Sequence, residues 1–509
     1  MELVQKIPKI KIIGFWVGLA AFFFIIFFID LDPKKPEMTN MLAVALLMAI
    51  WWVFEVVPLA ITALLPVVLY PLLGIMSGKV VSSVYINHII FLFLGGFMVA
   101  LAMQRWNLHK RIALRILLVT GTKPVSILFG FMFATAFLSM WISNTATTMM
   151  MLPILLSVGN KLNEYIGEEK TDKFITGLLL SVAYSASIGG VATLVGTPPN
   201  PMFTKIFQIM FPQGPDIGFT SWFIFALPIS IVLFLTTWLL LYLMYARHLK
   251  HVKIDKSTFK QQYKELGKAS YEEKIVLVDF ILMALAWLTR SPIHLGNVTI
   301  PGWSQLFHHP EYFNDGTVAI LFAIPLYIIP TKDHHSRFIM NWEYSKQLPW
   351  SIVLLFGGGF ALASGFKESG LSLWFGDQLA GLGHVSPIML ILSIALLMTF
   401  LTELTSNTAT TQIILPIIAS LSVSIHINPL LLMLPATLSA SMAFMLPVAT
   451  PPNAIVFGAN KLTVIQMAKT GIILNLVGAA VITLMTYYYG TVIFHIELNS
   501  FPAWATTVK

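Results

Sequence analysis

The six residues Ser143–Thr148, with the sequence SNTATT, occur a second time in this chain as Ser406–Thr411, 263 positions later. At the same shift, the GGF motif at Gly95–Phe97 corresponds to Gly358–Phe360. Three motifs are repeated in the same order, because TPPN at Thr197–Asn200 returns as Thr450–Asn453 at a shift of 253. This order indicates an internal duplication whose second copy is ten residues shorter between its last two motifs.

The composition shows which kind of environment the chain requires. Of its 509 residues, 57% are hydrophobic and only 11% are charged, and the mean hydropathy is +0.80. Soluble domains carry about 25% charged residues, so lipid must cover much of this surface. The absence of cysteine excludes disulfides, thiolate metal sites and a cysteine nucleophile. We therefore expect neither a cytosolic enzyme nor a nucleic-acid-binding protein, despite the net charge of +8.

Apolar runs occur throughout the chain, and a membrane-spanning helix needs roughly 20 mostly apolar residues. A membrane β-barrel would instead show alternating segments of about ten residues. The sequence predicts an all-α polytopic membrane protein with about 11 transmembrane helices and two re-entrant hairpins. The expected spans are Ile12–Phe28, Met41–Val57, Pro58–Ile75, Tyr85–Met103, Phe174–Met210, Ser221–Tyr245, Ile275–Leu288, Thr317–Ile329, Pro349–Gly365, Pro429–Phe457 and Thr470–Tyr489.

Two further stretches are too long for one span and carry polar residues at their centres. Pro124–Asn160 contains no Asp, Glu, Lys or Arg, and Val385–Ile427 contains only Glu403. Each includes one SNT motif, so we expect each to enter the membrane, turn at that motif and leave on the same side. The paired prolines of the two TPPN motifs lack N–H groups and block the preceding helical turn. They predict broken helices over 174–210 and 429–459.

The distribution of cations predicts the orientation, because short cytoplasmic loops retain Lys and Arg. With a cytoplasmic amino terminus, 24 of the 31 Lys and Arg residues lie inside, and the carboxyl terminus lies outside. The two copies then have opposite orientations. Inverted repeats with interrupted hydrophobic segments are typical of secondary transporters, whose site lies near the bilayer midplane. We expect a multi-pass protein of the plasma or inner membrane, with the lipid bilayer as a partner.

This topology also predicts how the chain is divided into domains. The predicted parts are an N-terminal segment with the first helix (1–39), first-repeat scaffold helices (40–123) with an interfacial helix at 105–118, a first transport part (124–246), a cytoplasmic linker (247–274), second-repeat scaffold helices (275–384) and a second transport part (385–509).

The helix breaks and the SNT tips provide a means of binding ions inside the membrane. Free N–H groups and the positive end of a helix dipole attract oxyanions. Freed carbonyls, together with Ser, Thr and Asn oxygens, suit a hard cation such as sodium. Neither tip has a Lys or Arg nearby, so helix ends, neutral donors and a bound cation would neutralise an anion. Alternatively, these polar residues only form hydrogen bonds between helices.

These motifs, together with RWNLHKR at Arg105–Arg111 and FMLPVA at Phe444–Ala449, resemble those of the divalent anion/sodium symporter family. The resemblance covers about residues 56–502 and is closest to the sodium-coupled di- and tricarboxylate branch. It implies a homodimer in which each protomer moves a transport domain against a scaffold, as an elevator. It also implies carriage of a C4-dicarboxylate such as succinate, fumarate or malate into the cell with several sodium ions.

The resemblance also implies the roles of individual residues. The two hairpin tips would each bind one substrate carboxylate, through Ser143, Asn144 and Thr145 and through Ser406, Asn407 and Thr408. Thr197, Pro198, Thr450 and Pro451 would line the two breaks. The two sodium sites would comprise Ser139, Ser143, Asn144 and Gly196 in the first copy, and Thr402, Thr405, Asn407 and Ala449 in the second.

Two acidic residues, Glu55 and Glu403, lie in apolar stretches, where a carboxylate is costly and usually functional. Glu403 precedes the second tip by three residues, and it would either tune the second cation site or pack between helices. Arg105–Arg115 intersperses cations with apolar residues, which predicts an amphipathic helix at the inner interface.

The leading hypothesis is sodium-coupled dicarboxylate import. Sodium-independent dicarboxylate exchange, sulfate symport and citrate symport are alternatives within the same family. A channel is the alternative from a different class. An enzyme is not expected, since no nucleophile–base pair or metal cluster lies near the tips.

Overall fold

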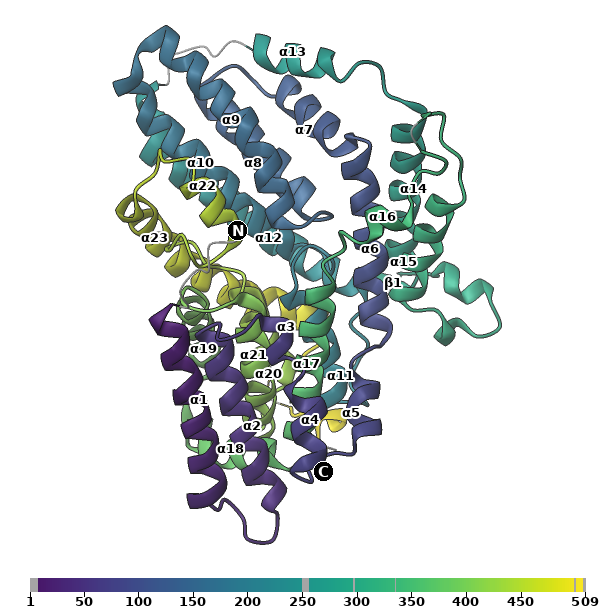
Figure 1. The fold of residues 1–509 in the computed structure, drawn as a ribbon, viewed down its shortest axis with the longest axis vertical. Helices are drawn as coiled ribbons and strands as arrows, with labels where there is room; N and C mark the ends of the chain where they lie inside the picture. Colours follow the sequence, from purple (N-terminus) through teal and green to yellow (C-terminus); the bar gives the residue numbers. More distant parts are fainter. Residues whose placement is uncertain (1–7, 250–255, 296–297, 335, 499, 507–509) are drawn as a thin grey trace, which may run out of the picture.

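The computed structural model describes residues 8–249, 256–295, 298–334, 336–498 and 500–506. Its architecture is an elongated assembly of helices (Figure 1). In the described part of the chain, seven helical segments are long and apolar enough to cross a membrane. These are Lys9–Phe28, Pro36–Val53, Gly78–Arg105, Thr171–Val191, Phe219–Leu249, Trp350–Glu368 and Val464–Ile493. Parts of the predicted N-terminal segment and linker, 1–7 and 250–255, lie outside the described residues.

The first half of the chain forms a series of helices that ends in a π-helical turn, η1, followed by a 3₁₀ turn, η2 (Arg247–Leu249). The elements are α1 (Lys9–Phe28), α2 (Pro36–Val53), α3 (Leu59–Thr62), α4 (Leu65–Leu72), α5 (Gly78–Val84), α6 (His88–Arg105), α7 (Leu108–Val119), α8 (Pro124–Ser139), α9 (Asn144–Ile166), α10 (Glu168–Val191), α11 (Pro199–Met210), α12 (Phe219–Leu241) and η1 (Tyr242–Ala246).

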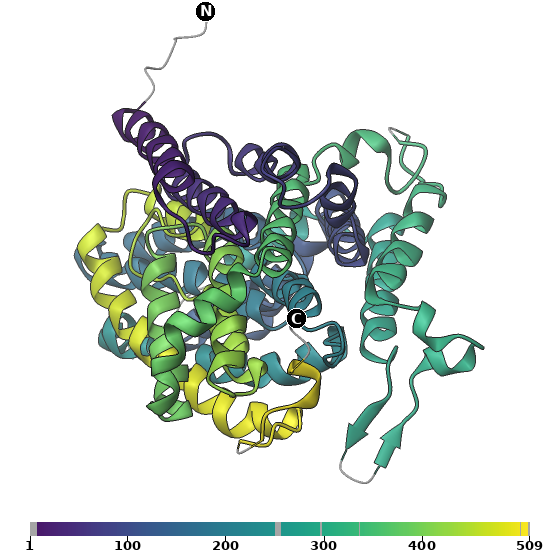
Figure 2. The same ribbon diagram turned by 90° about the horizontal axis from the view of Figure 1, so that it is seen from below.

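The second half follows a similar order after a short connecting helix. Its main elements are α13 (Ser257–Glu265), α14 (Tyr271–Leu288), β1 (Ile293–Leu295), β2 (Val298–Ile300), α15 (Asp315–Ala323), α16 (Trp342–Ser345), α17 (Trp350–Glu368), α18 (Leu371–Leu379), α19 (Pro387–Thr402), α20 (Asn407–Ser424), α21 (Pro429–Ser439), α22 (Pro451–Phe457), α23 (Val464–Leu484), η7 (Met485–Gly490) and α24 (Thr491–Ile493). The antiparallel strands β1 and β2 form a small ribbon that projects from the helices (Figure 2).

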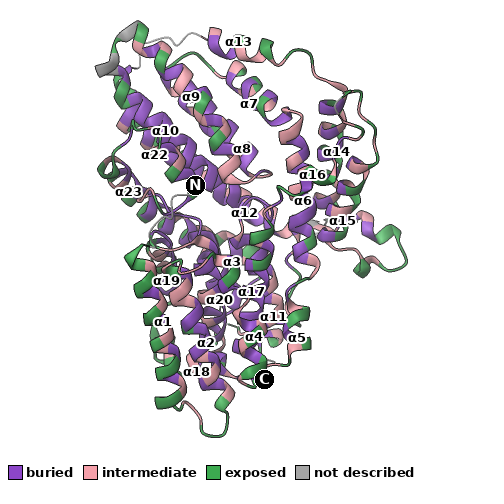
Figure 3. Ribbon diagram, viewed as in Figure 1, coloured by how far each residue is buried: buried purple, intermediate pink, exposed green. Residues whose placement is uncertain are grey.

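Burial separates the centre of the assembly from its edge. All of the apolar window in Thr171–Val191 of α10 is buried, whereas only 22% of the window in α1 is buried (Figure 3). Exposed α1 side chains such as Trp16, Phe27 and Phe28 are large and apolar. Since lipid tails are as apolar as these side chains, α1 is suited to face the bilayer, while α10 is enclosed by protein.

Both long stretches that contain an SNT motif are helix–turn–helix hairpins, α8–α9 and α19–α20. Pro124 and Pro387 occupy the first turns of α8 and α19, where a missing N–H costs no helical hydrogen bond. Ser143 and Ser406 are the N-cap residues of α9 and α20, so each SNT motif begins the second helix of its hairpin.

The two TPPN motifs begin helices after interruptions of different length. Residues 192–198 separate α10 from α11, whereas the longer segment 440–450 separates α21 from α22. Both interruptions are irregular backbone that follows a buried helix, α10 or α21. Such backbone is tolerated in a membrane only where protein or a water-filled cavity satisfies the polar groups.

The duplication extends to helix boundaries that the sequence motifs do not mark. At the shift of 263, both ends of α8 coincide with both ends of α19, and the first residue of α7 coincides with that of α18. The residues before these last two helices, Asn107 and Gly370, both have left-handed φ angles, of 57° and 77°. Asn and Gly tolerate this conformation best. Sequence analysis identified α7 but missed α18.

Several predicted boundaries were wrong. Arg105 ends α6 and does not belong to the interfacial helix, which begins only at Leu108 after the turn at Asn107. The expected span Pro58–Ile75 is two short helices, α3 and α4.

The predicted linker and Glu55 also differ from expectation. The linker 247–274 includes α13 and the start of α14, and Arg111 of α7 makes a buried ion pair of 2.8 Å with Glu273 there. Glu55 is exposed at a left-handed turn after α2, with a φ of 44°.

Candidate functional site

In the first copy, the hairpin tip and the centre of α10 are joined by a buried hydroxyl. Ser139 Oγ lies 2.5 Å from Asn144 Oδ1 and 2.7 Å from the carbonyl oxygen of Ala186. Ser139 is fully buried, and Asn144 is half-buried at the start of α9. The structure therefore brings together two of the four residues predicted for the first sodium site.

Gly196, the residue predicted from the first helix break, joins the same cluster through Gly190. A Cβ atom on Gly190 would lie 2.7 Å from Asn144 Oδ1 and 3.1 Å from the carbonyl oxygen of Gly196. A Cβ atom on Gly196 would lie 2.4 Å from the carbonyl oxygen of Gly190. These approaches are possible only without side chains at the two glycines. Sequence analysis missed Gly190, although it lies in a visible Gly189–Gly190 pair.

Asn200 of the first TPPN motif fixes the shape of the break. Its Nδ2 donates toward the carbonyl oxygens of Gly190, Val191 and Thr193, at 3.2, 3.2 and 2.7 Å. Thr193 Oγ1 in turn donates to the carbonyl oxygen of Met140 at the hairpin tip, at 2.5 Å. One buried amide therefore replaces the N–H groups that a continuous helix would have supplied.

The second copy repeats these contacts with corresponding residues. Thr402 Oγ1 lies 2.6 Å from Asn407 Oδ1 and 2.9 Å from the carbonyl oxygen of Ala440. Asn453 Nδ2 donates to the carbonyl oxygens of Ala443 and Leu446, both at 3.0 Å. At the shift of 253, these acceptors correspond to Gly190 and Thr193 in the first copy. The duplication therefore preserves the hydrogen bonds of the site as well as its amino-acid sequence.

The residues predicted to bind substrate lie at the two helix N-termini. Ser143, Thr145 and Ser406 are half-buried, and Thr408 is buried. Ser143 Oγ accepts a hydrogen bond from the backbone N–H of Ala146 at 3.3 Å. The first turns of α9 and α20 each present backbone N–H groups and the positive end of a helix dipole, which suits a carboxylate.

Other predicted residues lie in the helix breaks. Thr197 is buried and Pro198 is the N-cap of α11, while Thr450 is the N-cap of α22 and Pro451 is exposed. Thr405 Oγ1 donates to the carbonyl oxygen of Leu401 at 2.9 Å and contacts Thr410. Its hydroxyl is thus directed back along its own hairpin.

The chemistry of this region favours neutral oxygen ligands. Among the described residues, no group of three or more His, Asp or Glu side chains could hold a metal ion. The tip and break segments 139–148, 186–200, 402–411 and 440–453 contain no Lys or Arg, and their one acid is Glu403. Hydroxyl, amide and carbonyl oxygens are the ligands that hard cations prefer.

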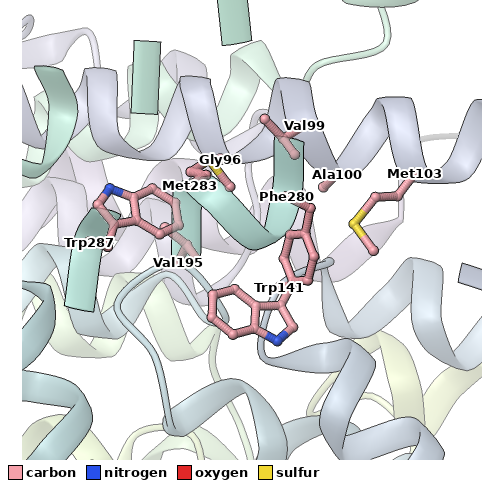
Figure 4. A pocket seen from close by; sticks show the side chains of 9 residues that line it. All are labelled: Gly96, Val99, Ala100, Met103, Trp141, Val195, Phe280, Met283 and Trp287. Atoms are coloured by element: carbon pink, nitrogen blue, oxygen red, sulfur yellow. The ribbon is translucent and has the colours of Figure 1, made fainter. Parts of the chain in front are cut away.

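A tightly packed apolar wall covers one side of the first tip (Figure 4). Trp141, which lies in the tip, packs edge-to-face against Phe280 of α14, with ring centroids 5.0 Å apart. Val195, which lies in the break, approaches Gly96 of α6. The space between them is too narrow for a water molecule. The residues lining it are Gly96, Val99, Ala100, Met103, Trp141, Val195, Phe280, Met283 and Trp287.

A duplicated, lipid-covered helical protein with paired hairpin tips beside paired helix breaks belongs to the class of membrane transporters. Residues 12–496 match the model of the family described as the sodium:sulfate symporter transmembrane region. The chain therefore belongs to this family, which is the divalent anion/sodium symporter family that the motifs resemble. The predictions of a multi-pass transporter and of no enzyme are confirmed.

Similar proteins of known name support the same assignment. Over 496 residues the chain is 43% identical to the "sodium-dependent dicarboxylate transporter SdcS" of Staphylococcus aureus strain bovine RF122, covering 96% of this chain and 93% of that protein. The SdcS proteins of strains NCTC 8325 and COL give the same values.

Two solved structures resemble the overall fold. The YdaH transporter of Alcanivorax borkumensis superimposes with a TM-score of 0.55 at 13% identity, covering 95% of this chain and 98% of that one. MtrF of Neisseria gonorrhoeae gives a TM-score of 0.54 at 12% identity, with coverages of 95% and 96%. At these identities the likeness concerns the fold alone.

Proposed function

We propose that this protein imports C4-dicarboxylates, such as succinate, fumarate or malate, by symport with sodium. The observation that carries the proposal is the pair of matching clusters, Ser139–Asn144–Ala186 and Thr402–Asn407–Ala440, each at the N-terminus of a hairpin helix. Two anion-binding helix ends suit a dianion with two separated carboxylates. The similarity to sodium-dependent dicarboxylate transporters supports the same choice.

In this proposal each hairpin tip binds one carboxylate of the substrate. Ser143, Asn144 and Thr145 donate from the first tip, and the matching residues Ser406, Asn407 and Thr408 donate from the second. Thr197, Pro198, Thr450 and Pro451 shape the adjoining breaks. Because no Lys or Arg belongs to these segments, sodium supplies the positive charge that the substrate requires.

Each sodium site lies behind its tip, between the hairpin and the broken helix. The first comprises Ser139, Ser143, Asn144 and Gly196, and the second comprises Thr402, Thr405, Asn407 and Ala449. In both, the Asn side chain offers an oxygen toward the cation and an N–H group toward the substrate. Binding of sodium therefore orients the amide that receives the carboxylate, which couples the two.

An elevator movement of the hairpins and broken helices is the proposed transport mechanism, and differences between the two copies support it. At the shift of 263, Gly96 of α6 corresponds to Gly359 of α17. Gly96 faces Val195 of its own break, whereas Gly359 faces Gln412 on the hairpin helix α20. Met149, which corresponds to Gln412, is 60% exposed. Sliding would exchange these two arrangements. We further propose a homodimer in the plasma or inner membrane, with a cytoplasmic amino terminus and an extracellular carboxyl terminus.

The decisive test is uptake of labelled succinate by proteoliposomes that contain the purified protein. We expect an inward sodium gradient to drive accumulation, and replacement of sodium by choline to abolish it. Uptake that ignores sodium but requires dicarboxylate inside the vesicle would establish exchange. Stronger competition by sulfate or citrate than by fumarate would assign a different substrate, and a steady single-channel current would indicate a channel.

A further inference from the structure

A pocket that the proposed transport does not use lies at the end of α12. It is an open cavity of about 360 Å³, lined by Lys173 of α10, by Leu243 and Met244 of η1, and by Arg247 and His248 of η2. Lys173, Arg247 and His248 are exposed, so their polar ends are accessible to a ligand. We call these five residues the basic pocket.

The π-helical turn η1 fixes the position of the basic pocket. Tyr245 of this turn is buried, and its hydroxyl oxygen lies 2.6 Å from Thr470 Oγ1 of α23. A Cβ atom on Gly177 of α10 would lie 2.4 Å from Tyr245 Cβ, so the turn packs directly on α10. Lys173 precedes Gly177 by four residues and therefore lies on the same face of α10. Turns of this π-helical kind occur frequently at functional sites.

The basic pocket carries positive charge that acidic side chains do not neutralise. Among the described residues, those that line it include no Asp or Glu. Lys173 and Arg247 form no ion pair with any acid in the described ranges. Asp172, which precedes Lys173, lies instead 3.8 Å from Lys461 Nζ. Lys and Arg offer only N–H donors, so the pocket suits a group with negatively charged oxygens, such as a phosphate.

An apolar stripe on α12 and η1 leads to the basic pocket. Its members are spaced by four residues, so they lie on one face of the helix, and each is between 46% and 51% exposed. At about 1.5 Å per residue, the stripe is about 18 Å long, slightly more than half of the roughly 30 Å hydrocarbon core. It therefore matches the acyl chains of one leaflet. The residues of the stripe are Ile231, Leu235, Leu239 and Leu243.

The basic pocket also lies at the depth of the lipid headgroups. The apolar segment Phe219–Leu249 has 31 residues, which corresponds to about 46 Å. A bilayer is about 40–45 Å thick with its headgroup regions, so Arg247 and His248 lie near the end of the segment that reaches these regions. The second copy differs, because α23 also ends in a π-helical turn but residues 485–494 contain no Lys, Arg or His.

We propose that the basic pocket binds the anionic headgroup of a phospholipid and that the apolar stripe holds the acyl chains of this lipid. Lys173 and Arg247 donate to the phosphate oxygens. The stripe favours a lipid over a free phosphate, since acyl chains cover exposed leucines and an inorganic anion does not. In the proposed orientation the lipid belongs to the cytoplasmic leaflet, whose surface is negatively charged. The inference is independent of the substrate that the protein transports.

The first test compares two lipids on the unmodified full-length protein in detergent. Phosphatidylglycerol and phosphatidylcholine with the same acyl chains are titrated, and thermal stabilisation is measured. We expect the half-saturating concentration of phosphatidylglycerol to be at least about tenfold lower, and added choline chloride to reduce this difference. Inorganic phosphate should not stabilise the protein. Equal half-saturating concentrations of the two lipids would overturn the proposal, and stabilisation by inorganic phosphate equal to that by phosphatidylglycerol would replace the lipid by a soluble anion.

The second test removes the charges of the basic pocket. Lys173→Gln and Arg247→Gln should each raise the half-saturating concentration of phosphatidylglycerol about fivefold, and the double variant about 25-fold. Lys264→Gln is the matched control, because Lys264 is an exposed cation of α13 that does not line the pocket. Its effect should be below about twofold. Equal effects of all three single variants would indicate diffuse attraction to the surface and would overturn the pocket as a site.

The third test concerns the apolar stripe. Leu239→Ser should raise the half-saturating concentration of phosphatidylglycerol about threefold, because it removes apolar contact with the acyl chains. Leu285→Ser on α14 is the matched control, since Leu285 is also 51% exposed. Equal effects at the two positions would overturn the placement of the acyl chains. Size-exclusion chromatography in detergent is the folding control, and if a variant fails to fold, the comparison of lipids on the unmodified protein still decides the proposal.

Discussion

The two hairpin tips contain the same six residues but have different surroundings. In the first copy, Trp141 and Val195 pack against α6 and α14, and Val195 is only 4% exposed. Their counterparts in the second copy, Leu404 and Val448, are 71% and 84% exposed. Large apolar side chains gain roughly 1.5–3 kcal/mol when they are fully buried. The same six-residue motif therefore lies in one covered and one uncovered environment.

The largest expected effect tests whether the two tips are equivalent in function. Asn144→Ala and Asn407→Ala each remove an amide that lies between a hydroxyl and the proposed substrate. Each should reduce succinate uptake at least about 100-fold, since a polar group built to bind a substrate cannot be replaced by a methyl group. Uptake by proteoliposomes at saturating sodium is the measurement.

The folding control for these two variants is size-exclusion chromatography in detergent, which should show unchanged profiles. Near-normal uptake by either variant would contradict the model in which both tips hold the substrate.

The next effect concerns the exposed and covered break residues, and the lack of native cysteine makes it measurable. Single-cysteine variants Val448→Cys and Val195→Cys should differ at least about tenfold in labelling rate by a membrane-impermeant thiol reagent, because only a solvated thiol reacts. If the hairpins slide, sodium and succinate together should slow the labelling of Val448→Cys and accelerate the labelling of Val195→Cys.

Labelling rates that sodium and substrate leave unchanged at both positions would argue against sliding. Labelling of both variants in detergent and after denaturation gives the maximum rate for each thiol.

A smaller effect is expected at the hydroxyls behind the tips. Ser139→Ala and Thr402→Val each remove a hydrogen bond to an Asn side chain and to a carbonyl oxygen. A lost hydrogen bond of this kind costs about 1 kcal/mol, so the half-saturating sodium concentration should rise about fivefold in each variant.

Sodium titrations of uptake measure both variants, and Thr236→Val is a matched control because that hydroxyl bonds only its own helix. Unequal changes in the half-saturating sodium concentration would show that the two sodium sites differ. If neither variant changes it, these hydroxyls do not belong to the sodium sites.

The smallest effect compares the hairpin helices themselves. Gln412 is fully buried and donates to the carbonyl oxygen of Leu355 at 2.7 Å, whereas Met149 at the corresponding position is exposed. Gln412→Met should lower the stability of this state by about 1 kcal/mol, because it removes that hydrogen bond. Met149→Gln should change it by less than about 0.5 kcal/mol. Melting temperatures in detergent, measured side by side, test this difference, and equal shifts would contradict it.

Much of the candidate site follows from local sequence rules. Proline pairs predict the two breaks because they remove N–H groups, and Ser143 and Ser406 mark helix starts because a hydroxyl can cap N–H groups. The helix α18 was missed, although the shift of 263 relates its first residue, Leu371, to the first residue of α7, Leu108. Gly190 and Asn200 were missed as site residues because their roles depend on the backbone that they approach, which lies several residues away along a folded break.

The sequence by itself determined that this is a duplicated helical membrane transporter. Composition, repeated motifs and proline pairs can be read along the chain, without knowledge of contacts between distant segments. The tertiary structure decided which of the two identical motifs is covered by other helices. It also decided which N–H groups donate hydrogen bonds to Glu403. Both depend on contacts between segments far apart in the chain: α6 and α14 close over Trp141, whereas Phe444–Leu446 and Asn475 converge on Glu403. Burial and charge balance are properties of such contacts, so two copies of one motif can differ in both.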